Sequence, residues 1–243
     1  MSRGHRVELC AGYLLHQRPF RDSSLILDLY TRDHGRLTAF ARGVRGPRPR
    51  FSGLQPFQPL LLSWSGRGEA PTLTGAECDG PALQLPPAML MGAFYLNELL
   101  LRLTIVHDPH PSLYDVYASA VAQLHAGAEL EPALRRFELQ LLEQSGYAVE
   151  LDREAGEGEP VQADAYYHLV PGVGLRHVAA GAPGATSGRV LLELAAGTVP
   201  GDADGRRQAR ALLRTALDHS LEGRVLASRT VARAVARIES RRG

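Results

Sequence analysis

The sequence predicts an α+β protein in which a small β-barrel of five strands is followed by a mainly helical domain. Its first 80 residues consist of short apolar or alternating runs separated by turn-rich segments. After Pro86 and Pro87, apolar residues recur at helical spacing instead. With 243 residues, of which 44% are hydrophobic, the chain can bury two small cores. We therefore expect a barrel domain over residues 1–80 and a helical domain over residues 81–243.

Five runs in the first domain have the length and pattern of strands. They are VELCAGYLLHQ, SSLILDLYT, GRLTAFARGV, PFQPLLLSW and APTLTGAEC. Turn-forming segments such as RPFRD and RDHG separate them, and the longest connection, RGPRPRFSGLQ, follows the third run. Five strands with short connections indicate a small closed barrel, and the OB-fold is the five-stranded barrel that binds oligonucleotides. An SH3-like barrel is the alternative.

Three helices are expected to follow. The run AMLMGAFYLNELLLRLTIV is apolar almost all round, but Asn97, Glu98 and Arg102 interrupt it, so we interpret it as a buried central helix and not as a membrane span. The next two are PSLYDVYASAVAQLHAG and EPALRRFELQLLEQSG. In the last of these, Pro132 suits the first turn and Gly146 suits the C-terminal cap.

The rest of the chain combines a Gly-rich region with further helices. EAGEGEP and HVAAGAPGATSG flank AYYHLVPGVGLRHV, which has the pattern of a β-hairpin. We expect this hairpin-containing insertion to cover about residues 147–186. Helices are expected again at SGRVLLELAAG, DADGRRQARALLRTALDHSL and SRTVARAVARIESRR, the last with Ser228 as its N-cap.

Composition and motifs exclude several classes of enzyme. All 27 basic residues are arginine, so no lysine exists for a Schiff base or a P-loop. The G-x-S-x-G and H-E-x-x-H motifs are absent from the sequence. His107, Asp108 and His110 are the nearest approach to a metal cluster, but a zinc site needs a further ligand. We expect no enzymatic activity, no metal and no cofactor.

The two cysteines and the N-terminus indicate a cytoplasmic protein. Cys10 and Cys78 lie in separate strand runs without a CxxC partner, so each is more typical of a small apolar filler than of a ligand or nucleophile. Two cysteines are too few for a disulfide framework, and MSRGHRVELC lacks the apolar run of a signal peptide.

Charge is strongly segregated along the chain. Residues 1–50 carry a net charge of +6 and residues 206–243 one of +7, whereas residues 81–160 carry −8. Such asymmetry is typical of a protein with a polyanionic partner, although a protein without one can show it too.

The segment FARGVRGPRPRF places four arginines where no helix can form. Its glycines let the backbone approach a ligand, its prolines hold it extended, and guanidinium groups suit phosphate oxygens. We predict that this segment and one arginine of the third strand bind DNA; the residues are Arg36, Arg42, Arg45, Arg48 and Arg50. Phe57 and Trp64 either stack on bases or, the more favoured interpretation, fill the barrel core.

Two further sets of arginines recur at helical spacing near the C-terminus. They are Arg207, Arg210 and Arg214 on one helix and Arg229, Arg233 and Arg237 on the next. Each set forms either a solvated helix surface or a second DNA-binding surface.

Several motifs in order resemble the RecO family of bacterial DNA repair proteins. They are GVRGPRPRFSGLQPFQPLLLSWSGRGEAPTL, then FYLNELLLRL, then EPALRRFELQLLEQSGY followed by GEGEPV. The resemblance implies an OB-fold and a helical domain that bind single- and double-stranded DNA and anneal complementary strands. It also implies that the protein, associated with the nucleoid, works with RecR to load RecA onto strands coated by single-stranded-DNA-binding protein. Many relatives carry a four-cysteine zinc module after the third helix, but this chain has no cysteine after Cys78, which implies a zinc-free variant.

The resemblance also implies roles for two sets of residues. In relatives, the segment that matches Arg42 to Arg50 carries basic residues that contact DNA. The segment that matches Arg135, Arg136 and Phe137 is where the acidic, apolar-ended C-terminal tail of single-stranded-DNA-binding protein docks. Helix electrostatics is the alternative for these arginines, through pairs of Arg135 with Glu131 or Glu138. For the whole chain, an RNA-binding OB-fold protein and a hydrolase with an unrecognised site remain alternatives.

Overall fold

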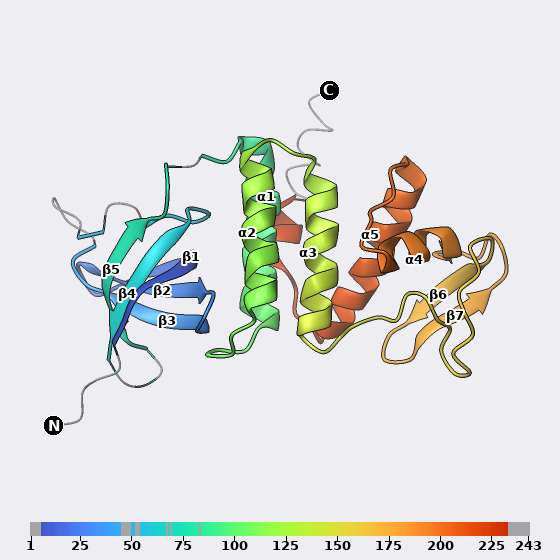
Figure 1. Ribbon diagram of the computed structural model, residues 1–243, viewed down its shortest axis with the longest axis horizontal. Coiled ribbons are helices and arrows are strands. Elements are labelled where there is room, and N and C mark those ends of the chain that lie inside the picture. The colour runs from blue at the N-terminus through green and yellow to red at the C-terminus, as the bar shows by residue number, and fades with distance from the viewer. Residues whose placement is uncertain are drawn as a thin grey trace. The chain divides into compact units, whose positions relative to one another are not determined.

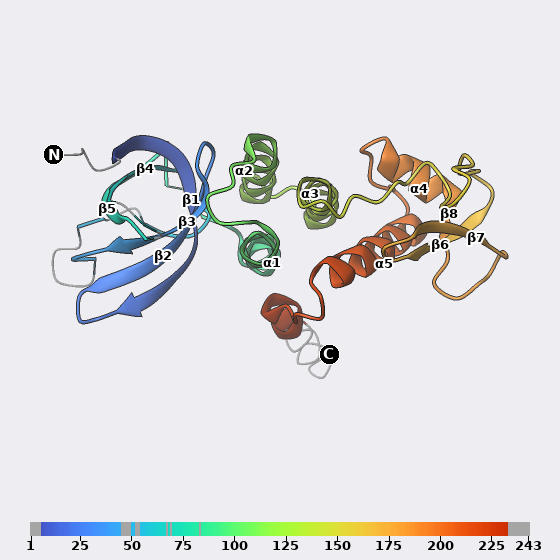
Figure 2. The same ribbon diagram turned by 90° about the horizontal axis from the view of Figure 1, so that it is seen from below.

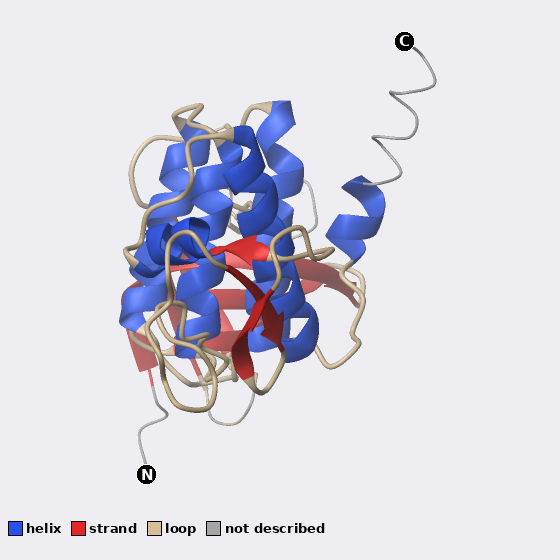
Figure 3. Ribbon diagram, turned by 90° about the vertical axis from the view of Figure 1, so that its right-hand side faces the viewer, coloured by secondary structure: helices blue, strands red, loops and turns tan. Residues whose placement is uncertain are grey.

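The computed structural model describes residues 6–44, 50–51, 54–66, 68, 70–82 and 84–232 (Figure 1). Two compact units make up the chain. The first consists of Met1–Ala128 together with Ala227–Gly243, and the second of Glu129–Leu226. The chain therefore leaves the first unit after α2 and returns to it near its end. Helices and strands occur in both units, which confirms the α+β class. Figure 3 colours the chain by these two kinds of element.

The first five strands form a closed, OB-like barrel, as predicted. They are β1 (Arg6–Phe20), β2 (Ser24–Thr31), β3 (Gly35–Ala41), β4 (Leu60–Ser65) and β5 (Thr72–Cys78). Their order around the barrel is β1-β2-β3-β5-β4, and β4 pairs back with β1. Neighbouring strands are antiparallel except for β3 and β5, which meet in parallel at Phe40 and Thr72.

The barrel closes because β1 is long enough to pair on both sides. Its first half pairs with β4 and its second half with β2, and register shifts after Val7 and Leu14 let the strand bend between them. At Gly12, where the two ladders overlap, a Cβ would lie 2.6 Å from Leu62 Cδ1. Alternate residues of β2 and β3, such as Leu27 and Ala39, fill the core, so the residues between them face outward.

Two helices, α1 (Pro87–Leu103) and α2 (Pro111–His125), belong to the same unit as the barrel. Each begins with a proline in its first turn, where the missing N–H has no intrahelical partner to lose. Asn97, which interrupts the apolar run of α1, is buried, and both polar atoms of its side chain form hydrogen bonds: Nδ2 donates to Leu15 O at 2.9 Å, and Oδ1 accepts from Tyr117 Oη at 2.6 Å. One amide thus joins β1, α1 and α2.

Tyr117, the donor to this amide, belongs to a cluster of four tyrosines. Tyr13 and Tyr30 of the barrel face Tyr114 and Tyr117 of α2, with ring centroids 5.0–6.0 Å apart. Burial raises the pKa of all four phenols, that of Tyr13 to about 12. The four rings contribute tilted and edge-to-face aromatic packing.

The boundary expected near residue 80 stays a prediction. It coincides with the change from strands to helices, whereas the compact units divide between Ala128 and Glu129. Of the described helices, none has both the length and the apolar character needed to cross a membrane.

The second unit contains α3 (Leu130–Gln144), β6 (Tyr166–Val170), β7 (Gly174–Val178), β8 (Thr186–Ser187), α4 (Gly188–Ala195) and α5 (Ala203–Ser220). The helix α3 ends at Gln144 with Ser145 as its C-cap, and the predicted Gly146 follows directly with a φ of 79°, which suits glycine. β6 and β7 pair antiparallel over the segment expected to form a hairpin, and β8 extends the sheet. Backbone hydrogen bonds such as Val161 N to Asp152 O close the Gly-rich turn before it, and Leu151 and Val161 enter the core.

The residues that follow α5 return to α1 (Figure 2). The Glu98 carboxylate accepts hydrogen bonds from Ala227 N at 2.8 Å, Ser228 N at 2.9 Å and Ser228 Oγ at 2.6 Å. We call this contact the Glu98 clasp. Ser228 is the predicted N-cap, whose hydroxyl would accept a hydrogen bond from a backbone N–H of the helix. In the structure the Glu98 carboxylate accepts from the first N–H groups, and the Ser228 hydroxyl donates to the same carboxylate, so this prediction is corrected. Arg229 also lies over the Tyr95 ring at 5.5 Å.

Replacing Glu98 by glutamine should destabilise the first unit at neutral pH. A neutral amide presents one acceptor to three donors, so we expect the free energy of unfolding to fall by about 1–2 kcal/mol. Urea denaturation followed by the fluorescence of Trp64, the single tryptophan, measures this change. Glu77→Gln, at an exposed carboxylate of β5, is the control and should unfold like the wild type.

The effect of Glu98→Gln should also depend on pH. Burial raises the pKa of Glu98, but the hydrogen bonds from Ser228 and Ala227 outweigh it, so the pKa lies below its ordinary value of 4.5. A carboxyl with a depressed pKa stabilises the fold above its unfolded pKa, and this contribution is lost as pH falls through the folded pKa. The difference between variant and wild type should therefore shrink below pH 4.5. A difference that stays constant there would rule out the clasp as a charged contact.

Candidate nucleic-acid interface

The arginine-rich segment after β3 begins and ends at one end of the barrel. Arg42 and Arg50 are both exposed, and the Arg50 N–H donates to Gly43 O at 3.0 Å, which closes the loop between them. Gly43 has a φ of 69°, so glycine suits this closure. The Arg50 guanidinium lies over the ring of Phe51 at 5.3 Å, and Phe51 is part of the barrel core. The predicted Arg45 and Arg48 lie outside the described residues.

The end of β1 and the turn that follows it add two arginines, Arg18 and Arg21, that the sequence alone did not single out. Arg18 and Arg21 are exposed, and Val44 N donates to Ser23 O at 3.0 Å, which ties this turn to the loop after β3. Both arginines stand in the segment RPFRD, but the local pattern of this segment predicts only a turn. The pairing of β1, β2 and β3 is needed to bring it beside the predicted arginines.

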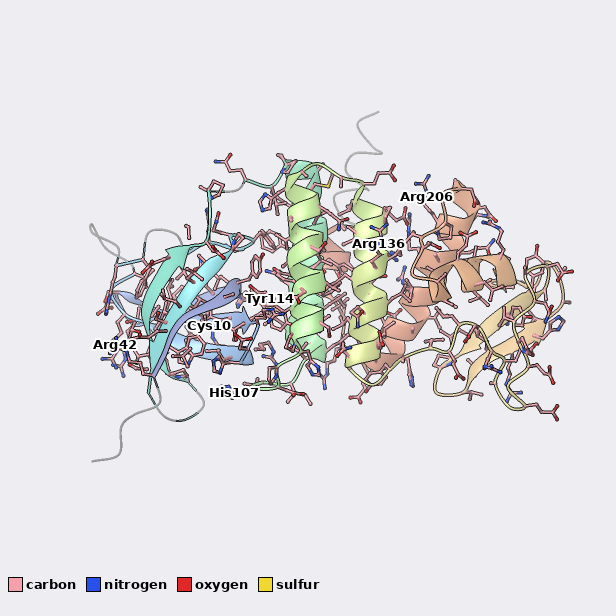
Figure 4. The ribbon with its side chains drawn as sticks, in the orientation of Figure 1. Cys10, Arg42, His107, Tyr114, Arg136 and Arg206 are labelled. Carbon is pink, nitrogen blue, oxygen red and sulfur yellow. The ribbon has the colours of Figure 1, made fainter. Side chains whose placement is uncertain are left out.

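We call these four exposed arginines, Arg18, Arg21, Arg42 and Arg50, the basic end of the barrel. In the described part of the chain none of them forms an ion pair, although Asp22 is exposed in the same turn. Figure 4 shows Arg42 at the side of the barrel away from Tyr114 and α2. Arg42 therefore lies on the side of the barrel away from the described residues of α2.

Arg36, the fifth predicted DNA-binding residue, has a different environment. Its Nε donates to Thr104 Oγ1 at 3.2 Å and its Nη2 to Thr104 O at 2.9 Å. Burial lowers the pKa of its guanidinium. The side chain thus fastens the C-terminal end of α1 to β3, and its contact with DNA stays a prediction.

Both aromatic residues considered for stacking are buried. Trp64 is 4% exposed within the barrel core, and Phe57 is 5% exposed with its ring centroid 5.0 Å from that of Phe94 on α1. The position of Trp64 agrees with the barrel-core interpretation, whereas Phe57 is buried against α1 and is not among the residues of the barrel-core cluster.

The arginines of α5 are paired with carboxylates of their own unit. Arg207 pairs with Asp204, Arg210 with Glu131 at 2.6 Å, and Arg214 more loosely with Asp218 at 3.6 Å. Arg206, labelled in Figure 4, pairs with Glu129 at 3.1 Å. This arrangement favours the interpretation as a solvated helix surface. On the last helix Arg229 contacts Tyr95, and Arg233 and Arg237 lie outside the described residues.

Of the three residues predicted to bind the partner tail, one is exposed. Arg135 is 7% exposed and its Nη2 lies 3.0 Å from Glu138 Oε1, while Phe137 is fully buried. Arg136 is exposed on α3 (Figure 4). The expected pair of Arg135 with Glu138 is present, whereas Glu131 pairs with Arg210 instead.

The remaining candidate ligands do not assemble into a metal site. His110 Nε2 lies 3.1 Å from Asp108 Oδ2, but in the described ranges no group of three or more His, Cys, Asp or Glu side chains is placed to hold a metal. The four-cysteine zinc module of relatives has no fit here, since the chain's only cysteines are Cys10 and Cys78. Cys10 is buried, and burial raises the pKa of its thiol. Cys78 is exposed, so its interpretation as an apolar filler is wrong.

Comparison with known proteins finds a matching family model for the N-terminal part and for the C-terminal part of the chain. The family model described as Recombination protein O N terminal matches residues 6–81, and that described as Recombination protein O C terminal matches residues 87–230. The DNA repair protein RecO of Azoarcus sp. (strain BH72) is 41% identical over 239 residues, which cover 95% of this chain and 97% of the relative. That of Methylococcus capsulatus is 44% identical over 230 residues, 94% of each chain. That of Laribacter hongkongensis is 41% identical over 244 residues, 97% of this chain and 98% of the relative.

Proposed function

Because the chain belongs to the RecO family of DNA repair proteins, we propose that it is a recombination mediator that binds single- and double-stranded DNA through the basic end of its barrel. It anneals complementary strands, and with RecR it helps to load RecA onto strands coated by single-stranded-DNA-binding protein. These steps make and break no covalent bond, so the protein acts without enzymatic turnover. Binding to chromosomal DNA places it at the nucleoid.

One observation carries the DNA-binding part of this proposal: four exposed arginines gather at the basic end without an ion pair among the described residues. An exposed guanidinium with no carboxylate beside it is available to phosphate, which it binds through two parallel hydrogen bonds. The loop from Arg42 to Arg50 adds Arg45 and Arg48 in sequence. The contrast with α5 is informative, because arginines there already have carboxylate partners.

Contact with phosphates suits strand annealing. Phosphate contacts carry no sequence information, so any pair of complementary strands can be bound. Neutralising phosphates on both strands lowers the repulsion between them and releases counterions. Most base edges remain free to pair, and no nucleotide hydrolysis is needed.

The second part of the proposal places the acidic tail of single-stranded-DNA-binding protein on α3. Arg136 supplies an exposed cation to a carboxylate of the tail, in a unit whose helix α3 also carries Glu131, Glu138 and Glu143. Arg135 supports the site from inside, since its ion pair with Glu138 is almost completely buried. RecR and RecA are proposed as partners from family membership.

Binding of single-stranded DNA should weaken with salt in proportion to the arginines that contact phosphate. Each phosphate neutralised on a single strand contributes about −0.7 to the slope of log K against log salt, so three or four contacts predict a slope of about −2 to −3. Replacing Arg21 and Arg42 by alanine should make this slope shallower by about 1 to 1.5. Fluorescence anisotropy of a labelled oligonucleotide in a salt titration measures both slopes.

Arg176→Ala is the matched control for this experiment. Arg176 is an exposed arginine of β7, in the second unit, and its replacement should leave the slope unchanged. An Arg21→Ala, Arg42→Ala variant with the wild-type slope would remove the basic end from the proposal. Tighter binding to structured RNA than to single-stranded DNA would instead favour an RNA-binding protein.

Binding of the partner's tail should depend on Arg136. We expect Arg136→Ala to weaken the binding of a labelled peptide with the tail sequence about fivefold or more, because one charge-assisted hydrogen bond is lost. Isothermal titration calorimetry measures the affinity. Gln140→Ala, an uncharged replacement on the same helix, is the control. Equal affinity of Arg136→Ala and wild type would discard Arg136 as the tail contact.

A further inference from the structure

The outer surface of β1, β2 and β3 carries an aromatic pair at the basic end. In β3 the alternate residues Leu37, Ala39 and Ala41 enter the barrel core, so Phe40 faces outward. Phe20 ends β1, lies outside the core cluster and is likewise half-buried. The two ring centroids are 5.2 Å apart with an angle of 48° between the ring planes.

The strand register shows what surrounds these rings. Phe40 is directly opposite Ile26 of β2, and Ile26 is directly opposite Arg18 of β1. Residues opposite each other in antiparallel strands share a face, so Arg18, Ile26 and Phe40 form one row across the sheet. Phe20 lies two residues beyond Arg18 and therefore on the same face. We call Phe20, Ile26 and Phe40 the Phe20–Phe40 patch.

Arginines of the basic end border this patch on several sides. Arg18 is in its row, and the Arg21 guanidinium lies 5.2 Å from the centroid of the Phe20 ring. Arg42 follows Phe40 by two residues at the end of β3 and is exposed. An apolar protein partner would gain little from such a border, whereas a polyanion that also presents flat rings matches both features.

Unpaired nucleic acid has this combination of chemistry. Bases of a single strand can stack on aromatic side chains while the backbone phosphates contact arginines, and stacking contributes to binding whatever the base. Bases of a duplex are already stacked inside the helix and cannot reach half-buried rings. We propose that the Phe20–Phe40 patch stacks with one or two unpaired bases, so that the basic end binds single-stranded DNA more tightly than duplex DNA.

This inference rests on the proposed function and sharpens it, since phosphate contact alone does not distinguish one strand from two. The patch holds only one or two bases, so neighbouring bases remain free to pair with a complementary strand. The patch differs from Phe57 and Trp64, the two residues considered for stacking in the sequence, which are buried.

The test compares the wild type with a variant in which Phe20 and Phe40 are both leucine. Leucine keeps the apolar surface and the fold but removes the flat ring. We expect the variant to bind a single strand about tenfold or more weakly and to bind a duplex of the same length as the wild type does. Loss of binding that is equal for strand and duplex, or no loss, would overturn the inference.

An abasic strand provides a second measurement on the same variants. It keeps the phosphates and removes the stacking rings, so wild type and leucine variant should bind it equally, and both should keep the wild-type salt slope. Phe94→Leu, at the 44% exposed phenylalanine of α1, is the control and should bind single strands normally. A leucine variant that loses as much affinity for the abasic strand as for the intact strand would show that the rings act on the fold, which contradicts stacking.

The same measurements distinguish binding to DNA from binding to RNA. They also show whether a negative result contradicts the stacking inference alone or the proposed function as well. Wild-type binding that is tenfold tighter to an RNA strand than to a DNA strand of the same sequence would overturn the assignment to DNA. If the leucine variant binds DNA normally while Arg21→Ala, Arg42→Ala shows the expected shallower salt slope, the proposed function stands and the stacking inference fails. If the wild type binds no DNA, both fail.

Discussion

The buried amide of Asn97 is the interaction on which the first unit depends. A polar group in an apolar interior must be satisfied, and this one is satisfied only when β1, α1 and α2 are all in place. Its donor Tyr117 belongs to the tyrosine cluster, and Arg36 fastens the end of α1 to β3. Through these contacts one side of the barrel packs against α1 and α2. The opposite end, with its exposed arginines, is left for a ligand.

The pairing state of each arginine, more than the net charge of a segment, indicates what it can do. Both ends of the chain are strongly basic in sequence. In the structure, Arg207, Arg210 and Arg214 already meet carboxylates, whereas the described arginines of the basic end meet none. The same residue type therefore stabilises a helix in one unit and remains available to phosphate in the other.

Much of this architecture could be predicted from the sequence because the relevant patterns are local. Alternation identified the five strands, helical spacing identified the helices, and burial of Phe57 and Trp64 followed from the apolar runs around them. Contacts that depend on register or on distant residues could not be predicted. The Phe20–Phe40 pair requires the alignment of three strands, and the Glu98 clasp joins residues 129 and 130 positions apart. Exposure of Cys78 at the end of β5 likewise has no signal in the local pattern.

The central claim is that the basic end of the barrel binds DNA phosphates and thereby promotes strand annealing without making or breaking a covalent bond. Its most direct test is the rate at which two complementary labelled strands anneal in the absence of ATP, followed by energy transfer between the labels. The wild type and Arg176→Ala should accelerate annealing equally, and the Arg21→Ala, Arg42→Ala variant should lose most of that acceleration. A variant that anneals as fast as the wild type would contradict the account.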